Sequence, residues 1–436
     1  MTSVDDRPTV RVPLGARLLP DLWHYGWWIS IAVAVVMFAT VGVGYYGLAV
    51  FLQPLQDENG WSNAWVSGAT GLYFVVTGIV GFLIGPYIDR RGPIRPMVIG
   101  VTLVGLSTMA LSLVDELWQL YLVYTVQAIA FGAAGAVAIN SIIARWFVTK
   151  RARAMAISAT GVSLGGVIFA PLGTWLIGEG GVALAAVVMG AVVLVIGLPI
   201  VTSVLVWDPT DMGSEVDTGS PDTSFQNASL SDSAQQKVWS RSEAARTVAF
   251  WAILVAFLLA LLAQTGFLLH QLAFLTQRFD SANAAALALS TTAFGSIVAR
   301  LVLGQFADRL DKRHLAAILF VVQAGALLAL VAIDSLVVSY LLVLVIGFTI
   351  GNIYMMQTLL VGETFGFVSM GTVFGVLSLT AQIGSGAGPL LVGVMEDRTG
   401  SYTAPFVTGA VLMLVAAVVV LGARPPTAPA ATADDR

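Results

Sequence analysis

The chain has 436 residues, of which 57% are hydrophobic and 11% are charged, and its net charge is −4. Soluble globular domains carry about a quarter charged residues, so this composition indicates a membrane protein. The sequence contains no cysteine, which excludes disulfides, thiolate catalysis and cysteine-ligated metals.

Twelve apolar segments are each long enough to cross a bilayer as a helix. In chain order they are 27–51, 63–86, 96–114, 117–144, 153–178, 182–207, 247–276, 283–306, 314–333, 336–362, 369–395 and 402–422. Residues 208–246 are rich in Ser, Asp, Thr and Gly, which is typical of a disordered linker. The first apolar run is too long for a signal-peptide core. The sequence thus predicts an all-α membrane protein with an N-terminal segment (1–26), two six-helix halves (27–207 and 247–422), a linker and a tail (423–436).

The positions of the cations predict the orientation of these helices. Most cations lie in the N-terminal segment, in the linker, or directly after the second, fourth and eighth helices: Arg7, Arg11, Arg17, Arg90, Arg91, Arg95, Arg145, Lys150, Arg151, Arg153, Lys237, Arg241, Arg246, Arg309, Lys312 and Arg313. Only Arg278 and Arg398 fall on the other side. Cytoplasmic loops carry the excess of Lys and Arg, so both termini and the linker are predicted to face the cytoplasm of a cell (inner) membrane.

A short polar pattern occurs twice, once in each half of the chain. Gly85-x-x-x-Asp89-Arg90 follows the second helix and Gly304-x-x-x-Asp308-Arg309 follows the eighth. The two aspartates are 308 − 89 = 219 residues apart, about half of the chain. Six-helix repeats joined by a central linker are a transporter architecture, with the binding site near the bilayer midplane between the halves.

The first patch, Gly85-x-x-x-Asp89-Arg90-Arg91-Gly92, resembles the loop signature of the major facilitator superfamily, and Asp308-Arg309 resembles its weaker second copy. Other motifs are similar to the monocarboxylate transporter family and its bacterial relatives: Tyr25-Gly26-Trp27-Trp28, Phe51-Leu52-x-Pro54-Leu55, Gly60-Trp61-Ser62, Arg145-Trp146-Phe147 and Ala299-Arg300-x-x-x-Gly304. The resemblance implies the major facilitator fold and a cytoplasmic gate that contains Asp89, Arg90, Asp308 and Arg309.

Arg300 is the sharpest candidate for substrate binding. It lies 308 − 300 = 8 residues before Asp308, about 12 Å inside the membrane. A cation at that depth costs at least ~2.5 kcal/mol, so it should face a partner or a water-filled cavity. Its guanidinium matches a carboxylate in bidentate fashion, and the resemblance implies that it binds the substrate carboxylate. The alternative is an arginine that packs helices together through backbone carbonyls.

Five further residues are predicted to line the substrate site. His270 is the histidine that the predicted helices place inside the membrane, where it would contact the anion or carry a proton, or else serve a structural role. Tyr46, Asn140 and Tyr354 fall on helices that line the cavity in the superfamily. Ser296 stands where some relatives carry Asp, and Tyr46 stands where the family has a substrate-linked Lys. The middle of the predicted helices holds no Asp or Glu, which leaves proton coupling open.

These observations predict a secondary transporter of a small organic anion, in particular a monocarboxylate, that works by alternating access in the lipid bilayer. Two alternatives are efflux of hydrophobic compounds and a non-transporting membrane sensor. An enzyme is rejected, because paired carboxylates, metal-ligand clusters and nucleophilic triads are missing from the predicted helices. No cofactor and no nucleic-acid partner is expected, and a monomer suffices because one chain holds both halves.

Overall fold

The structure, a computed structural model, describes residues 24–147, 150–212, 241–306, 310–365 and 370–424. These described residues form helices and contain no strand. The helices of the first half are α2 (Tyr25–Gly44), α3 (Tyr46–Asn59), α4 (Asn63–Arg91), α5 (Ile94–Ala110), α6 (Leu117–Ala134), α7 (Ala136–Trp146), α8 (Arg151–Val192) and α9 (Leu198–Ser203). Those of the second half are α11 (Arg241–Ala244), α12 (Val248–Phe279), α13 (Ala282–Phe306), α14 (Lys312–Ala332), α15 (Leu336–Phe365), α16 (Met370–Thr399) and α17 (Thr403–Val420).

Within the described part, 11 helical stretches are long and apolar enough to cross a membrane. One of them contains two predicted spans, because α8 is interrupted at Gly180 and Gly181. Gly181 has a φ of 69°, which a residue with a side chain rarely adopts. The predicted all-α fold with twelve membrane helices is therefore confirmed. The first and fourth spans are each divided into two helices, at Tyr45 and at Gly135.

Each half is held together by a close pair of helices, α2 with α8 and α12 with α16. In both pairs a glycine lies against the backbone of the neighbouring helix. A Cβ at Gly165 would lie 2.7 Å from the carbonyl oxygen of Phe38, and one at Gly384 would lie 2.6 Å from that of Leu258. Because 384 − 165 = 219, these glycines repeat at the offset of the duplicated polar patches.

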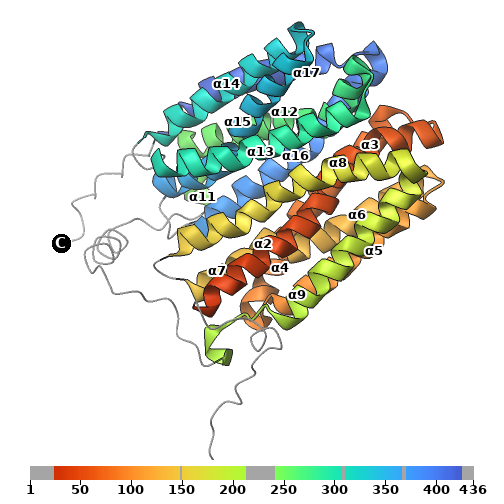
Figure 1. Cartoon of the computed structure of the whole chain (residues 1–436). Coiled ribbons are helices and arrows are strands. Elements are labelled where there is room, and N and C mark those ends of the chain that lie inside the picture. The colour runs from red at the N-terminus through yellow and green to blue at the C-terminus, as the bar shows by residue number, and fades with distance from the viewer. Residues whose placement is uncertain (1–23, 148–149, 213–240, 307–309, 366–369, 425–436) are drawn as a thin grey trace, which may run out of the picture.

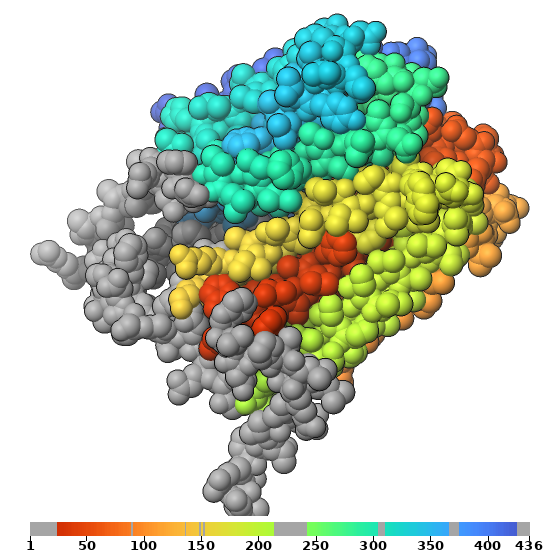
Figure 2. All heavy atoms as spheres, in the orientation of Figure 1, coloured from red at the N-terminus to blue at the C-terminus, as the bar shows by residue number. Residues whose placement is uncertain are grey.

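The two halves lie side by side, with the helices coloured red to yellow-green below those coloured green to blue (Figure 1). They meet mainly along two helix pairs, α4 with α16 and α8 with α13. The second pair is visible in Figure 2, where α8, in yellow, lies against α13, in green to teal. We call the end with Arg91, Arg145 and Arg313 the basic end, and the end with Asp115 and Asp397 the acidic end.

Candidate functional site

Arg300 lies on α13, at 306 − 300 = 6 residues from the basic end of the helix. Its Nη1 donates to the carbonyl oxygen of Ala159 at 3.2 Å and to the Ser163 hydroxyl at 2.9 Å. Its Nε donates to the carbonyl oxygen of Gly351 at 3.4 Å. Arg300 therefore joins α8 of the first half to α13 and α15 of the second, and these bonds correspond to the helix-packing alternative for this residue.

The Arg300 guanidinium forms no ion pair within the part of the chain that the structure describes. Its Nη2 donates to none of the described residues either. A half-buried guanidinium normally has its charge compensated by an anion. The side chain thus retains donors for an anionic ligand.

Two serines extend this contact between the halves. The Ser163 Oγ on α8 and the buried Ser296 Oγ on α13 lie 2.7 Å apart. Ser296 packs against Gly351, where a Cβ would lie 2.6 Å from its carbonyl oxygen. Ser296 was a predicted site residue, whereas Ser163 was not. The only signal for Ser163 in the sequence is its place between two glycines of α8, Gly161 and Gly165.

Tyr46 lies beside the same contact. Its ring covers Gly166 of α8, where a Cβ would come within 2.4 Å of the ring. Gly166 lies 166 − 163 = 3 residues after Ser163, so the Tyr46 ring and Ser163 lie on the same face of α8. The structure therefore brings Arg300, Ser296 and Tyr46 together, and adds Ser163 to them.

Tyr354 lies on α15 and is 40% exposed, although it belongs to a membrane-spanning helix. Its hydroxyl is 3.4 Å from the buried Ser385 Oγ of α16. This contact joins two helices of the second half, and among the described residues Arg300 makes no hydrogen bond to Tyr354.

A cavity of about 250 Å³ opens between the halves, next to the α4–α16 contact. Helices α4, α6, α7 and α16 contribute its walls: Thr77, Gly78, Gly81, Phe82, Phe131, Gly132, Gly135, Val137, Gly375, Ser378, Leu379 and Gln382. Most of this surface is apolar or glycine backbone. Arg300 does not line this cavity, and neither does Asn140, an exposed residue of α7.

His270 is completely buried on α12, at 279 − 270 = 9 residues from the acidic end of that helix. Its Nε2 donates to the carbonyl oxygen of Pro389 at 3.1 Å and lies 3.2 Å from the Ser67 Oγ. Its ring packs on Tyr402. The structure does not bring His270 to Arg300, because the two lie toward opposite ends of the membrane-spanning bundle.

The predicted gate residues fall largely outside the described part. Asp308 and Arg309 lie outside the described residues, as does the side chain of Asp89. Arg90 is exposed in the last turn of α4. The described neighbour Gly92 has a φ of 79° and packs on the ring of Trp207.

A charged contact fixes the basic end of the first half beside Gly92. Arg145 stacks over the Trp207 ring at 4.1 Å and binds Asp208 at 2.5 Å. The pKa of Asp208 is below its usual value, because partial burial raises it but hydrogen bonds from Thr210 and Arg145 lower it by more. The α4–α5 turn is thus held to the segment that follows α9.

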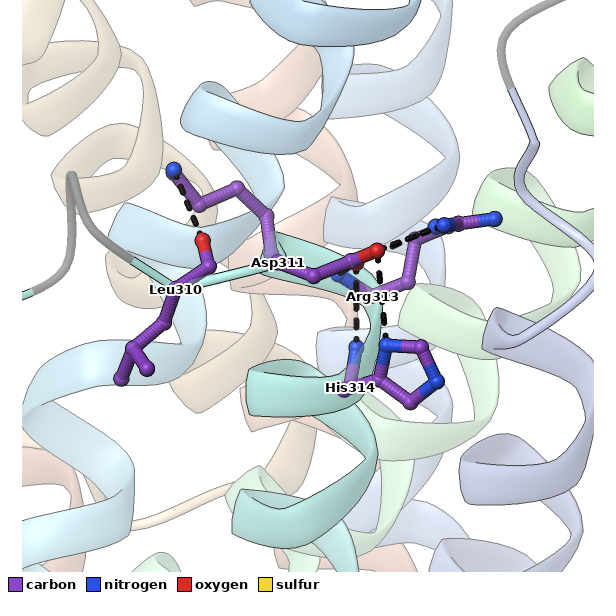
Figure 3. A network of polar contacts seen from close by, with 5 residues as sticks. Leu310, Asp311, Arg313 and His314 are labelled. Atoms are coloured by element: carbon purple, nitrogen blue, oxygen red, sulfur yellow. Dashed lines mark hydrogen bonds and ion pairs between the residues drawn. The ribbon is translucent and has the colours of Figure 1, made fainter.

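In the second half, the described residues that follow Asp308-Arg309 form a helix cap. Asp311 accepts hydrogen bonds from the backbone N–H groups of Arg313 and His314 at the start of α14. Its carboxylate also binds the Arg313 guanidinium at 2.5 Å and lies 3.4 Å from His314 Nδ1 (Figure 3). The hydrogen bond from the Arg313 side chain is the main cause that lowers the pKa of Asp311.

In the described residues, no group of three or more His, Cys, Asp or Glu side chains could hold a metal ion. The polar groups near Arg300 are hydroxyls and carbonyl oxygens. They can accept from the guanidinium but cannot neutralise it. The chemistry that this arrangement supports is the binding of an anion.

A sequence profile described as the Major Facilitator Superfamily matches residues 33–389 and, in a second match, residues 271–436. The oxalate:formate antiporter of Oxalobacter formigenes is 26% identical over 53% of this chain and 51% of its own length. Monocarboxylate transporter 13 of Bos taurus is 24% identical over 76% of this chain and 74% of its own. An aspyridones efflux protein of Emericella nidulans is 31% identical over 34% of this chain and 31% of its own.

The chain therefore matches about half the length of the antiporter and about a third of the efflux protein. Among solved structures, an inward-facing, occupied bacterial homologue of the human lysosomal transporter Spinster has a TM-score of 0.71. It is 17% identical, and the match covers 91% of this chain and 97% of that one. The structural likeness shows a shared fold, and the profile covers more than half of the sequence. The chain belongs to the Major Facilitator Superfamily.

Proposed function

We propose that this protein is a secondary transporter that moves a small monocarboxylate across the cell membrane by alternating access. Residues 27–207 and 247–422 form the two halves that move relative to each other, and residues 208–246 join them. The basic end faces the cytoplasm, as the distribution of Lys and Arg in the loops favours. The superfamily and the relatives named above are transporters, so the chain is not an enzyme.

The observation that carries this proposal is the environment of Arg300. A guanidinium within a membrane span, without an ion-pair partner in the described residues, favours an anion as its ligand. A single positive charge at this site is balanced by a single carboxylate. Relatives named for formate and for monocarboxylates support the same class of substrate, and oxalate, a dicarboxylate, is also a small organic anion.

The geometry also suggests how binding would act on the two halves. Arg300 now donates across the interface to Ala159 and Ser163 of α8. A carboxylate that takes these donors removes hydrogen bonds between α8 and α13, and Ser296 and Tyr46 lie beside it to contact the substrate. Binding would then favour the conformation in which the interface is rearranged, since a ligand shifts an equilibrium by its differential affinity for the two states.

The experiment is uptake of labelled formate, acetate and lactate into proteoliposomes by Arg300→Ala and Arg300→Lys variants. Arg278→Lys is a matched control, because Arg278 also donates to backbone carbonyls, those of Leu330 and Val331, but within one half. Uptake should be lost in both Arg300 variants and kept in the control. Wild-type rates in Arg300→Ala would contradict the anchoring role of this residue.

A second candidate function, efflux of hydrophobic compounds, is favoured by one observation. The cavity between α4, α6, α7 and α16 has mostly apolar walls, which suit an apolar molecule. The aspyridones efflux protein is a relative that is named for efflux. Under this alternative, expression raises the resistance of cells to hydrophobic compounds, and Arg300→Ala retains that resistance.

A further inference from the structure

A group of polar residues joins the two halves at the acidic end of the molecule. It consists of Asn63 and Ser67 of α4, His270 of α12, Glu396 and Asp397 of α16, and Tyr402 between α16 and α17. We call this group the acidic-end cluster. Sequence analysis singled out only His270 among its members.

Asp397 caps a helix of the other half. Its Oδ1 accepts from the backbone N–H of Asn63 at 2.9 Å, and its Oδ2 accepts from that of Ala64 at 2.7 Å. These N–H groups lie in the first turn of α4, where a helix has no internal acceptors for them. A carboxylate at this position also interacts favourably with the helix dipole. The side chain of Ser62, the residue before the helix, makes no capping bond, so Asp397 supplies the cap.

The Asn63 side chain adds two further bonds between the halves. Its Nδ2 donates to Glu396 Oε2 at 3.1 Å and to the Tyr402 hydroxyl at 3.0 Å. Its Oδ1 accepts from Gln56 and Ser67 of its own half. Every donor and acceptor position of this buried amide is therefore used, and half of its bonds depend on the second half.

The cluster extends toward the membrane interior through Ser67 and His270. His270 Nε2 lies 3.2 Å from Ser67 Oγ and donates to the carbonyl oxygen of Pro389. Glycines allow α4 and α16 to approach closely here. A Cβ at Gly71 would lie 2.6 Å from the carbonyl oxygen of Gly386, and one at Gly393 would lie 2.7 Å from Ser67 Oγ.

The same two helices separate toward the basic end. A cavity lies there between Gly81 and Phe82 of α4 and Gly375 and Ser378 of α16. A Cβ at Gly81 or Gly85 would meet no atom within 4 Å. Among the described residues, α4 and α16 are thus joined by hydrogen bonds at the acidic end, whereas a cavity lies between them toward the basic end. The bonds of Asn63 and Ala64 to Glu396, Asp397 and Tyr402 cross between the halves, so they require a closed acidic end.

We propose that Asn63, Glu396 and Asp397 are positioning residues that hold the acidic end of the transporter closed, and that breaking their bonds is the step that opens it. This proposal rests on the alternating-access function proposed above. Asp397, which caps α4 from the other half, contributes most to this closure. Its carboxylate accepts two charge-assisted hydrogen bonds and also interacts with the dipole of α4.

The absence of cysteine makes a direct test possible. Leu113 and Val337 are 74% and 71% exposed at the acidic ends of the two halves, so Leu113→Cys and Val337→Cys accept spin labels without other reactive sites. Double electron–electron resonance in lipid nanodiscs then gives the distance between the halves with no substrate present. Failure of monocarboxylate uptake leaves this measurement unaffected, so the two proposals are tested separately.

The labelled Leu113→Cys/Val337→Cys protein, the background for the other variants, should show one short distance between its two spin labels at the acidic end. Asp397→Asn should add a longer distance, with the ratio of open to closed raised about tenfold. Asn63→Asp should open this end further. It places a third negative charge beside Glu396 and Asp397, and an acidic residue in the first turn also preserves the helix. Asp397→Glu, which keeps the carboxylate, should restore most of the short distance.

The matched control is Asp334→Asn, because Asp334 also binds a partner at the acidic end, Arg278, but within its own half. Its distances should equal those of the background. The proposal is overturned if Asp397→Asn and Asn63→Asp leave the short distance unchanged. It is equally overturned if Asp334→Asn produces the same opening, or if the background itself shows the long distance.

Discussion

The two interfaces between the halves differ in where their polar contacts lie. Along α8 and α13 they run from the hydroxyl of Ser290, which donates to the carbonyl oxygen of Val167, to Arg300, near the basic end. Along α4 and α16 they gather at the acidic end, around Asn63 and Asp397, and the basic end holds a cavity. Among the described residues, the basic end of the α4–α16 interface therefore holds a cavity, while the α8–α13 interface is hydrogen-bonded near that end.

This difference separates two tasks that a transporter must perform. The α8–α13 interface contains a cation whose donors a ligand can take, so it can respond to substrate. The described polar contacts of the α4–α16 interface gather at the acidic end, around Asn63 and Asp397, so we propose that they set the balance between conformations. Variants of the first should change substrate uptake most strongly, whereas variants of the second should first change the distances between the halves.

The largest effect is expected for Arg300→Ala. Loss of two charge-assisted hydrogen bonds to a carboxylate costs about 3 to 6 kcal/mol, which corresponds to at least a hundredfold loss of affinity. Uptake of labelled monocarboxylate in proteoliposomes measures it. Ser163→Ala separates helix packing from anion binding, because it removes a hydroxyl from the α8–α13 contact but leaves the Arg300 guanidinium in place. We expect uptake in this variant to fall by less than about tenfold. An equal loss in both variants would show that packing, and not anion binding, explains the effect.

A second large effect is expected for Gly71→Val, which tests the other interface. Its Cβ would lie 2.6 Å from the Gly386 carbonyl oxygen, so α4 and α16 must move apart, and such overpacking costs about 1 to 3 kcal/mol. The spin-label distance at the acidic end should lengthen. Gly325→Val on α14 is the control, because a Cβ there meets no atom within 4 Å. An unchanged distance in Gly71→Val would argue against close approach of these helices as the basis of closure.

The sequence was sufficient to predict the all-α membrane fold, because the length and composition of each apolar segment identify a membrane span. The 219-residue repeat predicted the two halves, and the orientation read from the cations stays a prediction. The sequence also draws attention to Arg300, because a cation is conspicuous in an apolar helix; its role in substrate binding stays a prediction. It did not reveal Ser163 or the trans cap by Asp397. Serine is common in helices, and an aspartate at a helix end looks like an ordinary surface charge. Their roles depend on which residue of the other half lies opposite them, and the neighbouring sequence does not show which residue that is.

A moderate effect is expected for Ser296→Asp, which adds an acid beside Arg300. The new carboxylate would compete with the substrate for the guanidinium, so uptake at pH 7 should fall about tenfold. Because protonation of the carboxyl would free Arg300, uptake should then increase as the pH falls, whereas the wild type should lack this dependence on the carboxyl. Uptake measured at several external pH values checks it. A pH profile identical to that of the wild type would place Ser296 too far from the anion to interact with it.

The smallest effect is expected at Asp311, which caps its own helix α14 and so contrasts with Asp397, which caps a helix of the other half (Figure 3). Hydrogen bonds from Arg313 lower its pKa below the usual 3.8, so its charged form is favoured in the folded state. That stabilisation is complete above pH 3.8 and is lost as the pH falls through the lower pKa of the folded protein.

Asp311 is 37% exposed at its side chain, and Asn is an equally good cap. Asp311→Asn should therefore lower the Tm at pH 7 by only about 1 °C, with the difference fading below pH 3.8. Because this cap involves one half only, the spin-label distance between the halves should not change, and a change there would mean that Asp311 also contributes to the contact between them.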